Sequence, residues 1–174
     1  LWQYMADVFL KWCWRGVDGF RCDAGYMIPI EAWMYIIARV RQQYPETIFL
    51  LEGLGGRQSV TCDLLNRANF NWAYSELFQN YDRGQIEYYL PPVFEISRQD
   101  GITVHFAETH DNNRLAATSS AWARLRTALA AFCSYNGGFG FANGVEWLAT
   151  EKINVHDSPA LNWGHSPNLV DWIR

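Results

Sequence analysis

Hydrophobic positions follow two different periods along this chain. In residues 1–15 and 31–44, apolar side chains recur three and four positions apart, which predicts helices. Residues 17–23 and 47–51 are short apolar runs, which predict strands. The two patterns keep alternating as far as residue 142, and the remainder is rich in loop-forming residues. Further helices are predicted at 58–68, 85–98 and 122–135, and further strands at 69–75, 102–107 and 138–142.

Proline residues affect two of the predicted helices. Pro45 closes the helix over 31–44, because proline cannot continue it. Pro91 and Pro92 fall inside 85–98, where each lacks the backbone N–H that the helix needs and clashes with the preceding turn. We therefore expect that helix to be interrupted.

Strands that alternate with helices over short connections predict an α/β fold with parallel strands. The strands are almost continuously apolar, as expected when both faces of a sheet are covered. Acidic residues follow three of them, at Asp23, Glu52 and Asp111. In a (β/α)8 barrel the carboxyl ends of the strands carry the active site, so we predict a fold of this TIM-barrel type.

An open doubly wound sheet is the alternative architecture, and it binds phosphates through a glycine-rich first turn. Residues 53–56 (Gly-Leu-Gly-Gly) are the candidate for such a turn. They follow an acidic residue and lack the Lys and the Ser or Thr that a phosphate-binding loop uses. Nucleotide binding is therefore disfavoured.

The composition is that of a folded globular domain. Hydrophobic residues make up 49% and charged residues 18% of the 174 residues, which excludes a disordered chain. The net charge of −4 is opposite in sign to that needed for nucleic acid or an anionic membrane, so neither is an expected partner. No CxxC pair occurs among the cysteines, which we interpret as free thiols of a cytoplasmic protein. They are Cys13, Cys22, Cys62 and Cys133.

Two of the carboxylates have different predicted surroundings. Asp23 lies two residues after Arg21, so on a strand both side chains point to the same side. The neighbouring cation favours an ionised Asp23, which suits a nucleophile. Glu52 instead follows Ile48 and Leu50 on one side of a strand, and this apolar stack favours the protonated form of a general acid. Taken singly, the two sites also fit a structural ion pair and a solvated glutamate.

Asp111 follows His110 just beyond the predicted strand 102–107. An Asx turn or a helix cap is a simpler use of this aspartate. His110 and Asp111 could also belong to a metal-dependent hydrolase, but the further histidines of such a site do not occur at suitable spacings. Three carboxylates at one edge of a sheet are better explained by retaining glycoside hydrolysis, which needs a nucleophile and an acid flanking one bond.

Three segments resemble ordered signature motifs of the α-amylase superfamily, glycoside hydrolase family 13. They are GFRCDA at 19–24, LEG at 51–53 and FAETHD at 106–111, in the order of the fourth, fifth and seventh barrel strands of that family. Residues 138–146 resemble its eighth strand. Further segments are similar to the branch that contains glucan maltosyltransferases, which transfer a maltosyl unit to an α-1,4-glucan. These segments are 1–21, 48–52, 136–138 and 146–154.

The resemblance implies a role for each matched residue. Asp23 corresponds to the catalytic nucleophile, and Glu52 corresponds to the general acid/base. Asp111 corresponds to the carboxylate that binds sugar hydroxyls and stabilises the transition state. Arg21 corresponds to the residue that orients the nucleophile, and His110 to the hydrogen-bonding neighbour of Asp111.

The sequence departs from the family pattern after Ala24. Many amylases have Lys-His where this chain has Gly-Tyr-Met at 25–27. Those positions usually contact the acceptor sugar and lend a carbonyl to calcium. We therefore expect no metal or other cofactor in this chain, with calcium left open for the intact parent. Tyr26 and Trp72 are the candidates for sugar-stacking platforms.

We expect residues 1–174 to form a partial catalytic barrel that covers about strands 4 to 8 and lacks the first signature motif. The resemblance implies that the intact parent is an enzyme that hydrolyses or transfers α-1,4-glucans, malto-oligosaccharides included, through a covalent glycosyl–Asp23 intermediate. The alternative is a non-catalytic glucan-binding or self-assembling half-barrel. Exposed sheet edges favour pairing with another chain, so we expect homo-oligomers and no activity from the isolated chain.

Overall fold

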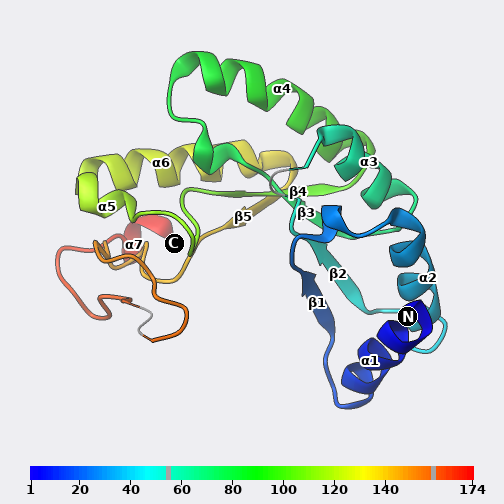
Figure 1. Cartoon of the computed structure of the whole chain (residues 1–174). Helices are drawn as coiled ribbons and strands as arrows, with labels where there is room; N and C mark the ends of the chain where they lie inside the picture. The colour runs from blue at the N-terminus through cyan, green and yellow to red at the C-terminus, as the bar shows by residue number, and fades with distance from the viewer. Residues whose placement is uncertain (54–55, 158–159) are drawn as a thin grey trace. The chain divides into compact units, whose positions relative to one another are not determined.

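The structure is a computed structural model that describes residues 1–53, 56–157 and 160–174. The chain packs as two compact units, which Figure 1 traces from the N-terminus in blue to the C-terminus in red. The first unit consists of residues 1–75 and 92–103, and the second of residues 76–91 and 104–174. Each unit is described separately below.

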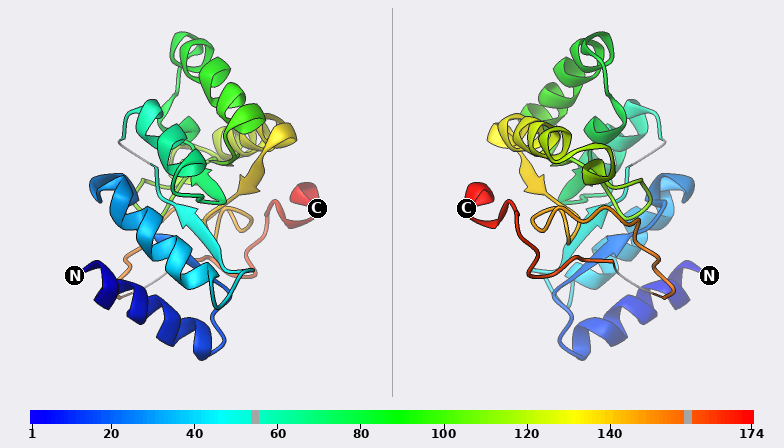
Figure 2. Two further views of the ribbon diagram at one scale, coloured as in Figure 1. Left: turned by 90° about the vertical axis from the view of Figure 1, so that its right-hand side faces the viewer. Right: turned by 90° about the vertical axis from the view of Figure 1, so that its left-hand side faces the viewer.

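Parallel strands and covering helices make up the first unit. Strand β1 (Gly19–Cys22) pairs with β2 (Ile48–Leu51), and β2 pairs with β3 (Trp72–Tyr74), all in parallel. The register places Arg21 beside Leu50, and Leu50 beside Trp72. Figures 1 and 2 show the main helices of this unit following one another on one side of β1 and β2. These helices are α1 (Trp2–Trp14), α2 (Ile30–Arg41) and α3 (Gln58–Asn66), and a short 3₁₀ helix, η1 (Gly25–Met27), follows β1.

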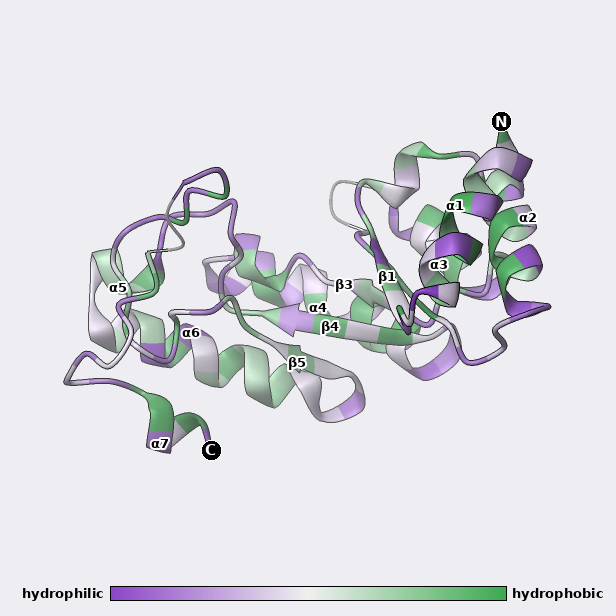
Figure 3. Cartoon of the chain, turned by 90° about the horizontal axis from the view of Figure 1, so that it is seen from below, coloured by the Kyte–Doolittle hydropathy of each residue, from purple (hydrophilic) through white to green (hydrophobic). Residues whose placement is uncertain are grey.

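One face of the strands packs against these helices. In β2 the buried side chains alternate, with Phe49 and Leu51 fully buried and Ile48 37% exposed. Phe49 lies in an aromatic cluster with Phe9 and Phe70, at ring-centroid distances of 5.7 and 6.4 Å. The hydropathy colours of Figure 3 show hydrophobic and hydrophilic residues mixed along α1 and α2, as expected of helices that cover only one face of a sheet.

The second unit is built on a shorter parallel pair. Strand β4 (Ile102–Phe106) contributes its last three residues to this unit, and they pair in parallel with β5 (Gly138–Gly140). Val104 lies beside Gly138, and Phe106 lies beside Gly140. A Cβ atom at Gly140 would lie 2.6 Å from the Phe106 ring, so only glycine fits there. The helical elements are η2 (Leu77–Gln79), the second unit's part of α4 (Arg83–Gln99), α5 (Leu115–Thr118), α6 (Ser120–Cys133), η3 (Ser134–Asn136) and α7 (Val170–Ile173).

The α/β fold class and each predicted strand are confirmed, but the expected interruption at the two prolines is wrong. Helix α4 runs unbroken through Pro91 and Pro92. The carbonyls that lose their N–H partners belong to Glu87 and Tyr88, which are both exposed, so water can bond to them. One of the boundaries between the two units nevertheless falls between Pro91 and Pro92.

Burial also determines the state of one histidine in β4. His105 is fully buried, and this burial lowers its pKa to about 4. The imidazole is therefore neutral at physiological pH and acts as a packed core residue. Within the described residues, no helix combines the length and the apolar character needed to cross a bilayer.

Core packing in the first unit gives a stability prediction. Replacing Ile37, which is 2% exposed in α2, with alanine should lower the free energy of unfolding by about 2–5 kcal/mol, because it leaves a cavity. The same change at Ile28, which is 43% exposed, should cost less than about 1 kcal/mol. Urea unfolding of both variants measures the difference, and equal losses would contradict this assignment of the core.

Candidate active site

Parallel pairing brings two carboxylates to neighbouring positions in the first unit. Cys22, the last residue of β1, lies beside Leu51, the last residue of β2. The Glu52 N–H donates to the Cys22 carbonyl at 3.1 Å, which extends the ladder by one residue. Asp23 and Glu52 are therefore the first residues past the ends of two paired strands.

One guanidinium group contacts both carboxylates. Arg21 Nη1 lies 2.6 Å from Asp23 Oδ1, and Nη2 lies 3.5 Å from Glu52 Oε1. The Arg21 side chain is 34% exposed and its Cζ lies 5.8 Å from the centroid of the Tyr74 ring. Burial by itself would lower the pKa of Arg21, but the hydrogen bond to Asp23 and the charges of Glu52 and Asp23 raise it overall. Arg21 is thus a permanent cation between two acids.

The surroundings of Glu52 differ from those expected from the sequence. The expectation of an apolar environment is wrong, because Glu52 Oε1 lies near Arg21 and Oε2 accepts the Ala24 N–H at 2.6 Å. The carboxylate therefore lies among polar groups, between a guanidinium and a backbone N–H. The two acids still differ in exposure, since the Asp23 side chain is 78% exposed and that of Glu52 only 15%.

Ala24 holds its amide toward Glu52 in a strained backbone conformation. Its φ of 43° and ψ of 36° lie in the left-handed region, which residues with a Cβ atom rarely adopt. Such strain persists where surrounding contacts over-determine the backbone, and it is typical of functional sites. Here the conformation directs the Ala24 N–H, which follows Asp23 in the chain, toward the carboxylate of Glu52.

Tyr26 and Trp72, the two candidate sugar platforms, have different settings. Tyr26 lies in η1, is half-buried against the core of the first unit, and has Gly56 packed on it. A Cβ atom at Gly56 would lie 3.1 Å from Tyr26 Cβ. Trp72 begins β3 and is 36% exposed. The candidate phosphate-binding turn at 53–56 includes two residues, 54 and 55, that lie outside the described part of the chain.

Cys22 is buried immediately behind this site. Burial raises the pKa of its thiol to about 12, and the nearby Arg21 offsets only part of that rise. The thiol is therefore protonated at physiological pH and is not the nucleophile of this site.

His110 and Asp111 form a pair in the second unit, on the loop that follows β4. His110 Nε2 lies 3.3 Å from Asp111 Oδ2, and the side chains are 43% and 73% exposed. Thr109 shapes the loop, because its hydroxyl donates to Asn112 Oδ1 at 2.6 Å and accepts the Asp111 N–H at 3.4 Å. The structure thus brings together Arg21, Asp23 and Glu52 in one unit, and His110 with Asp111 in the other.

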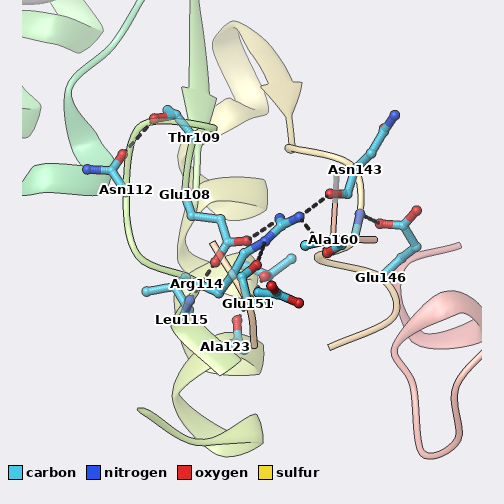
Figure 4. A network of polar contacts seen from close by, with 12 residues as sticks. Glu108, Thr109, Asn112, Arg114, Leu115, Ala123, Asn143, Glu146, Glu151 and Ala160 are labelled. Carbon is cyan, nitrogen blue, oxygen red and sulfur yellow. Dashed lines mark hydrogen bonds and ion pairs between the residues drawn. The ribbon is translucent and has the colours of Figure 1, made fainter. Parts of the chain in front are cut away.

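A buried ion pair lies at the base of the same loop and was not singled out from the sequence. Arg114 Nη1 lies 2.8 Å from Glu108 Oε1, with side-chain exposures of 0% and 3% (Figure 4). The available signal was a pair of opposite charges on either side of His110 and Asp111. Neither its burial nor its partners could be read from that spacing.

The described residues offer no group of three or more His, Cys, Asp and Glu side chains that could hold a metal ion. The alternative of a metal-dependent hydrolase built on His110 and Asp111 therefore lacks a ligand set in that part of the chain.

Comparison with solved structures defines the class of fold. The chain superposes on an α-amylase from Lactobacillus plantarum with a TM-score of 0.73 and 25% identity, covering 99% of this chain and 45% of that one. A cyclic α-maltosyl-(1→6)-maltose hydrolase from Arthrobacter globiformis gives a TM-score of 0.72 at 16% identity, which supports the fold alone. The chain is a partial barrel of the (β/α)8 type found in α-amylases, as predicted.

Sequence comparison finds similar proteins that share one name. The chain is 30% identical to an alpha-1,4-glucan:maltose-1-phosphate maltosyltransferase from Cereibacter sphaeroides, over 84% of this chain and 24% of that protein. A protein of the same name from Myxococcus xanthus is 28% identical over 99% of this chain and 27% of its own length. No family profile matches the chain. It spans about a quarter of the length of the curated relatives it matches. It is similar in sequence to these maltosyltransferases and in fold to α-amylases, the superfamily of glycoside hydrolase family 13.

The strained conformation of Ala24 gives a prediction about the site. Ala24→Gly should stabilise the protein by up to about 1 kcal/mol, because glycine adopts the left-handed region without strain and keeps the N–H that Glu52 accepts. Ala38→Gly, at an exposed position inside α2, should instead destabilise it by about 0.5–1 kcal/mol. Urea unfolding measures both signs, and a clear loss at Ala24 would mean that the left-handed assignment is wrong.

Proposed function

We propose that these residues belong to a retaining enzyme that acts on α-1,4-glucans, with Asp23 as nucleophile and Glu52 as general acid/base. The observation that carries the proposal is the Arg21 guanidinium, which contacts both carboxylates at the ends of adjacent parallel strands. Retaining glycosidases need two carboxyl groups close enough to act on one glycosidic bond from opposite sides. Residues 1–174 would form the C-terminal part of the catalytic barrel domain.

In the first chemical step, Glu52 donates a proton to the glycosidic oxygen while Asp23 attacks the anomeric carbon. The 78% exposure of the Asp23 side chain leaves it open to a sugar, while its contact with Arg21 keeps it ionised. Bond cleavage leaves the glycosyl unit esterified to Asp23, and the departing group takes the proton from Glu52. That group is a sugar when the donor is a glucan and phosphate when the donor is maltose 1-phosphate.

In the second step, Glu52 takes a proton from an incoming hydroxyl group, and that oxygen displaces Asp23. Esterified Asp23 no longer carries a charge, so Arg21 then faces only the carboxylate of Glu52. The Arg21 and Ala24 contacts hold the Glu52 carboxylate in place for this step. Water as the incoming group gives hydrolysis, and a sugar hydroxyl gives transfer.

The remaining site residues are assigned to substrate binding. Asp111 is proposed to bind sugar hydroxyls and to stabilise the positive charge of the transition state, with His110 as its hydrogen-bonding neighbour. Tyr26 is proposed to stack on a sugar ring, since its half-buried ring lies directly after the strand that ends at Cys22. The names of the relatives favour maltosyl transfer from maltose 1-phosphate to an α-1,4-glucan as the specific reaction.

The compartment proposed for this protein is the cytoplasm. All four cysteines are free, three of them buried and Cys62 half-buried. Free thiols are retained in reducing compartments, whereas secreted proteins of this size commonly pair theirs.

Substitution of the two acids should separate their roles. In the intact protein, Asp23→Asn should lower turnover by roughly 10⁴-fold or more and abolish the glycosyl-enzyme, because no nucleophile remains. Glu52→Gln should still form the intermediate from a glycosyl fluoride, whose leaving group needs little protonation. Mass spectrometry detects the intermediate, and assays with maltose 1-phosphate and with malto-oligosaccharides distinguish transfer from hydrolysis.

Asp18→Asn is the matched control, because Asp18 is an exposed aspartate just before the opposite end of the same strand. It should leave turnover unchanged. A product of inverted anomeric configuration, or full activity in Asp23→Asn, would disprove the proposed chemistry.

A second candidate is a half-barrel that assembles with copies of itself. The observation that favours it is the exposed inner face of the strands, where Ile48 is 37% exposed and Leu50 only half-buried. The described residues contain five strands, whereas a closed barrel has eight. Apolar residues left on an open sheet favour pairing with another chain.

The isolated 174-residue chain is therefore expected to self-associate and to show no α-glucan hydrolysis or transfer. Analytical ultracentrifugation and a product assay on the same preparation test both expectations. A monomeric and active preparation would contradict them.

A further inference from the structure

The Glu108–Arg114 pair is unusual because every polar side-chain atom of both residues has a hydrogen-bond partner. Glu108 Oε1 accepts from Arg114 at 2.8 Å, and Oε2 accepts the Leu115 N–H at 2.6 Å. The two hydrogen bonds close the loop after β4 at its base. Residues 109–113 lie between the two ends of this closure (Figure 4). They include half-buried His110 and exposed Asp111.

The remaining donors of Arg114 reach segments that are distant in sequence. Nη2 donates to the Asn143 carbonyl at 2.8 Å and to the Ala160 carbonyl at 3.3 Å, and Nε donates to the Glu151 carbonyl at 3.2 Å. Figure 4 shows these carbonyls converging on the guanidinium from the segment after β5 and from the chain beyond it. A single buried cation thus connects three segments of the second unit.

Gly144 shows how closely this arrangement is fitted. A Cβ atom at Gly144 would lie 2.7 Å from Arg114 Nη2, and its φ of 100° is one that residues with a side chain rarely adopt. The backbone at Gly144 therefore lies so close to the guanidinium that a side chain there would clash with it.

Stability alone does not account for a pair of this kind. Removing two charges from water costs much of what their attraction returns, and apolar residues of similar size often replace such pairs without loss. A buried polar network with every hydrogen bond made does, however, select one arrangement of the backbone over others. The segment whose arrangement it selects here is the one that carries His110 and Asp111.

We infer that Glu108 and Arg114 are positioning residues that fix Asp111 and His110 in place for the reaction. Arg114 connects this loop to the backbone carbonyls of Asn143, Glu151 and Ala160. The inference rests on the proposed function for the role of Asp111. Transition-state stabilisation depends steeply on geometry, and a displacement of about 1 Å can cost roughly 100-fold in rate. Substrate binding depends on many other contacts and is less sensitive.

Two variants of the pair and one control test this inference in the intact protein. Arg114→Lys keeps the positive charge but cannot reach Glu108 and three carbonyls together. Glu108→Gln keeps the size of the side chain and removes its charge. The control is Arg126→Lys, which changes another buried arginine of the same unit that donates to the Leu77 and Asn80 carbonyls, away from the His110–Asp111 loop.

Three measurements are made on each protein: kcat and KM with the active donor, the melting temperature, and amide hydrogen exchange over residues 109–113. Arg114→Lys should lower kcat by roughly 10- to 100-fold while KM changes by less than about 3-fold. Exchange over 109–113 should become at least about 10-fold faster. Glu108→Gln should change the same quantities in the same direction by a smaller factor. Arg126→Lys should leave kcat and the exchange of 109–113 within about 3-fold of the values for the unsubstituted protein. This should hold even if Arg126→Lys lowers the melting temperature as much as Arg114→Lys does.

The outcomes separate this inference from the proposed function. Unchanged exchange over 109–113 in both Arg114→Lys and Glu108→Gln overturns the inference, whether or not the protein acts on glucans. A fall in kcat no larger than that of Arg126→Lys also overturns it, because the effect would then follow from stability alone. A protein without activity on any α-glucan donor disproves the proposed function, and with it the catalytic part of this inference. Fast exchange with selective loss of kcat supports both.

Discussion

The parallel pairing of β1 with β2 is the constraint on which the candidate site depends. Parallel strands end at the same edge of a sheet, so residues with matching register emerge side by side. Here the register leaves Asp23 and Glu52 as neighbours, although 28 residues separate the Ala24 amide from the glutamate that accepts it. The helices that cover the outer face hold this register through fully buried Phe49 and Leu51. A shift of one residue would turn those side chains out of the core.

Two arginines serve different tasks in the two units. Arg21 is 34% exposed and contacts two carboxylates, of which that of Asp23 is 78% exposed, so its charge is available to the chemistry. The Arg114 side chain is fully buried, and its donors are taken up by a carboxylate and by backbone carbonyls. Desolvation makes a cation in that position useful for fixing backbone and unsuited to meeting a ligand. Exposure, more than residue type, therefore separates the proposed chemistry from the proposed positioning.

The two faces of the strands in the first unit also differ in burial. The outer face carries the aromatic core, whereas Ile48 on the other face is 37% exposed. In a closed barrel that inner face is filled by side chains from every strand. The likeness to α-amylases covers 45% of the Lactobacillus plantarum enzyme, in agreement with a sheet that presents part of a barrel interior. The apolar residues of one strand thus lie in two different environments, a packed core on the outer face and a partly exposed surface on the inner face.

Much of this protein could be read from its sequence. Periodicity determined the order and type of the helices and strands, because helix and strand place apolar residues at different spacings. Acidic residues at or beyond the ends of strands made Asp23, Glu52 and Asp111 the candidate site residues, since parallel strands end at one edge. Contacts that join distant segments were decided by the tertiary structure alone. They include the polar surroundings of Glu52, the left-handed Ala24 and the burial of Glu108 with Arg114. Each of these features depends on which groups meet in the folded chain and on how much hydration those groups lose there. The spacing of residues along the chain determines neither the contacts nor the loss of hydration.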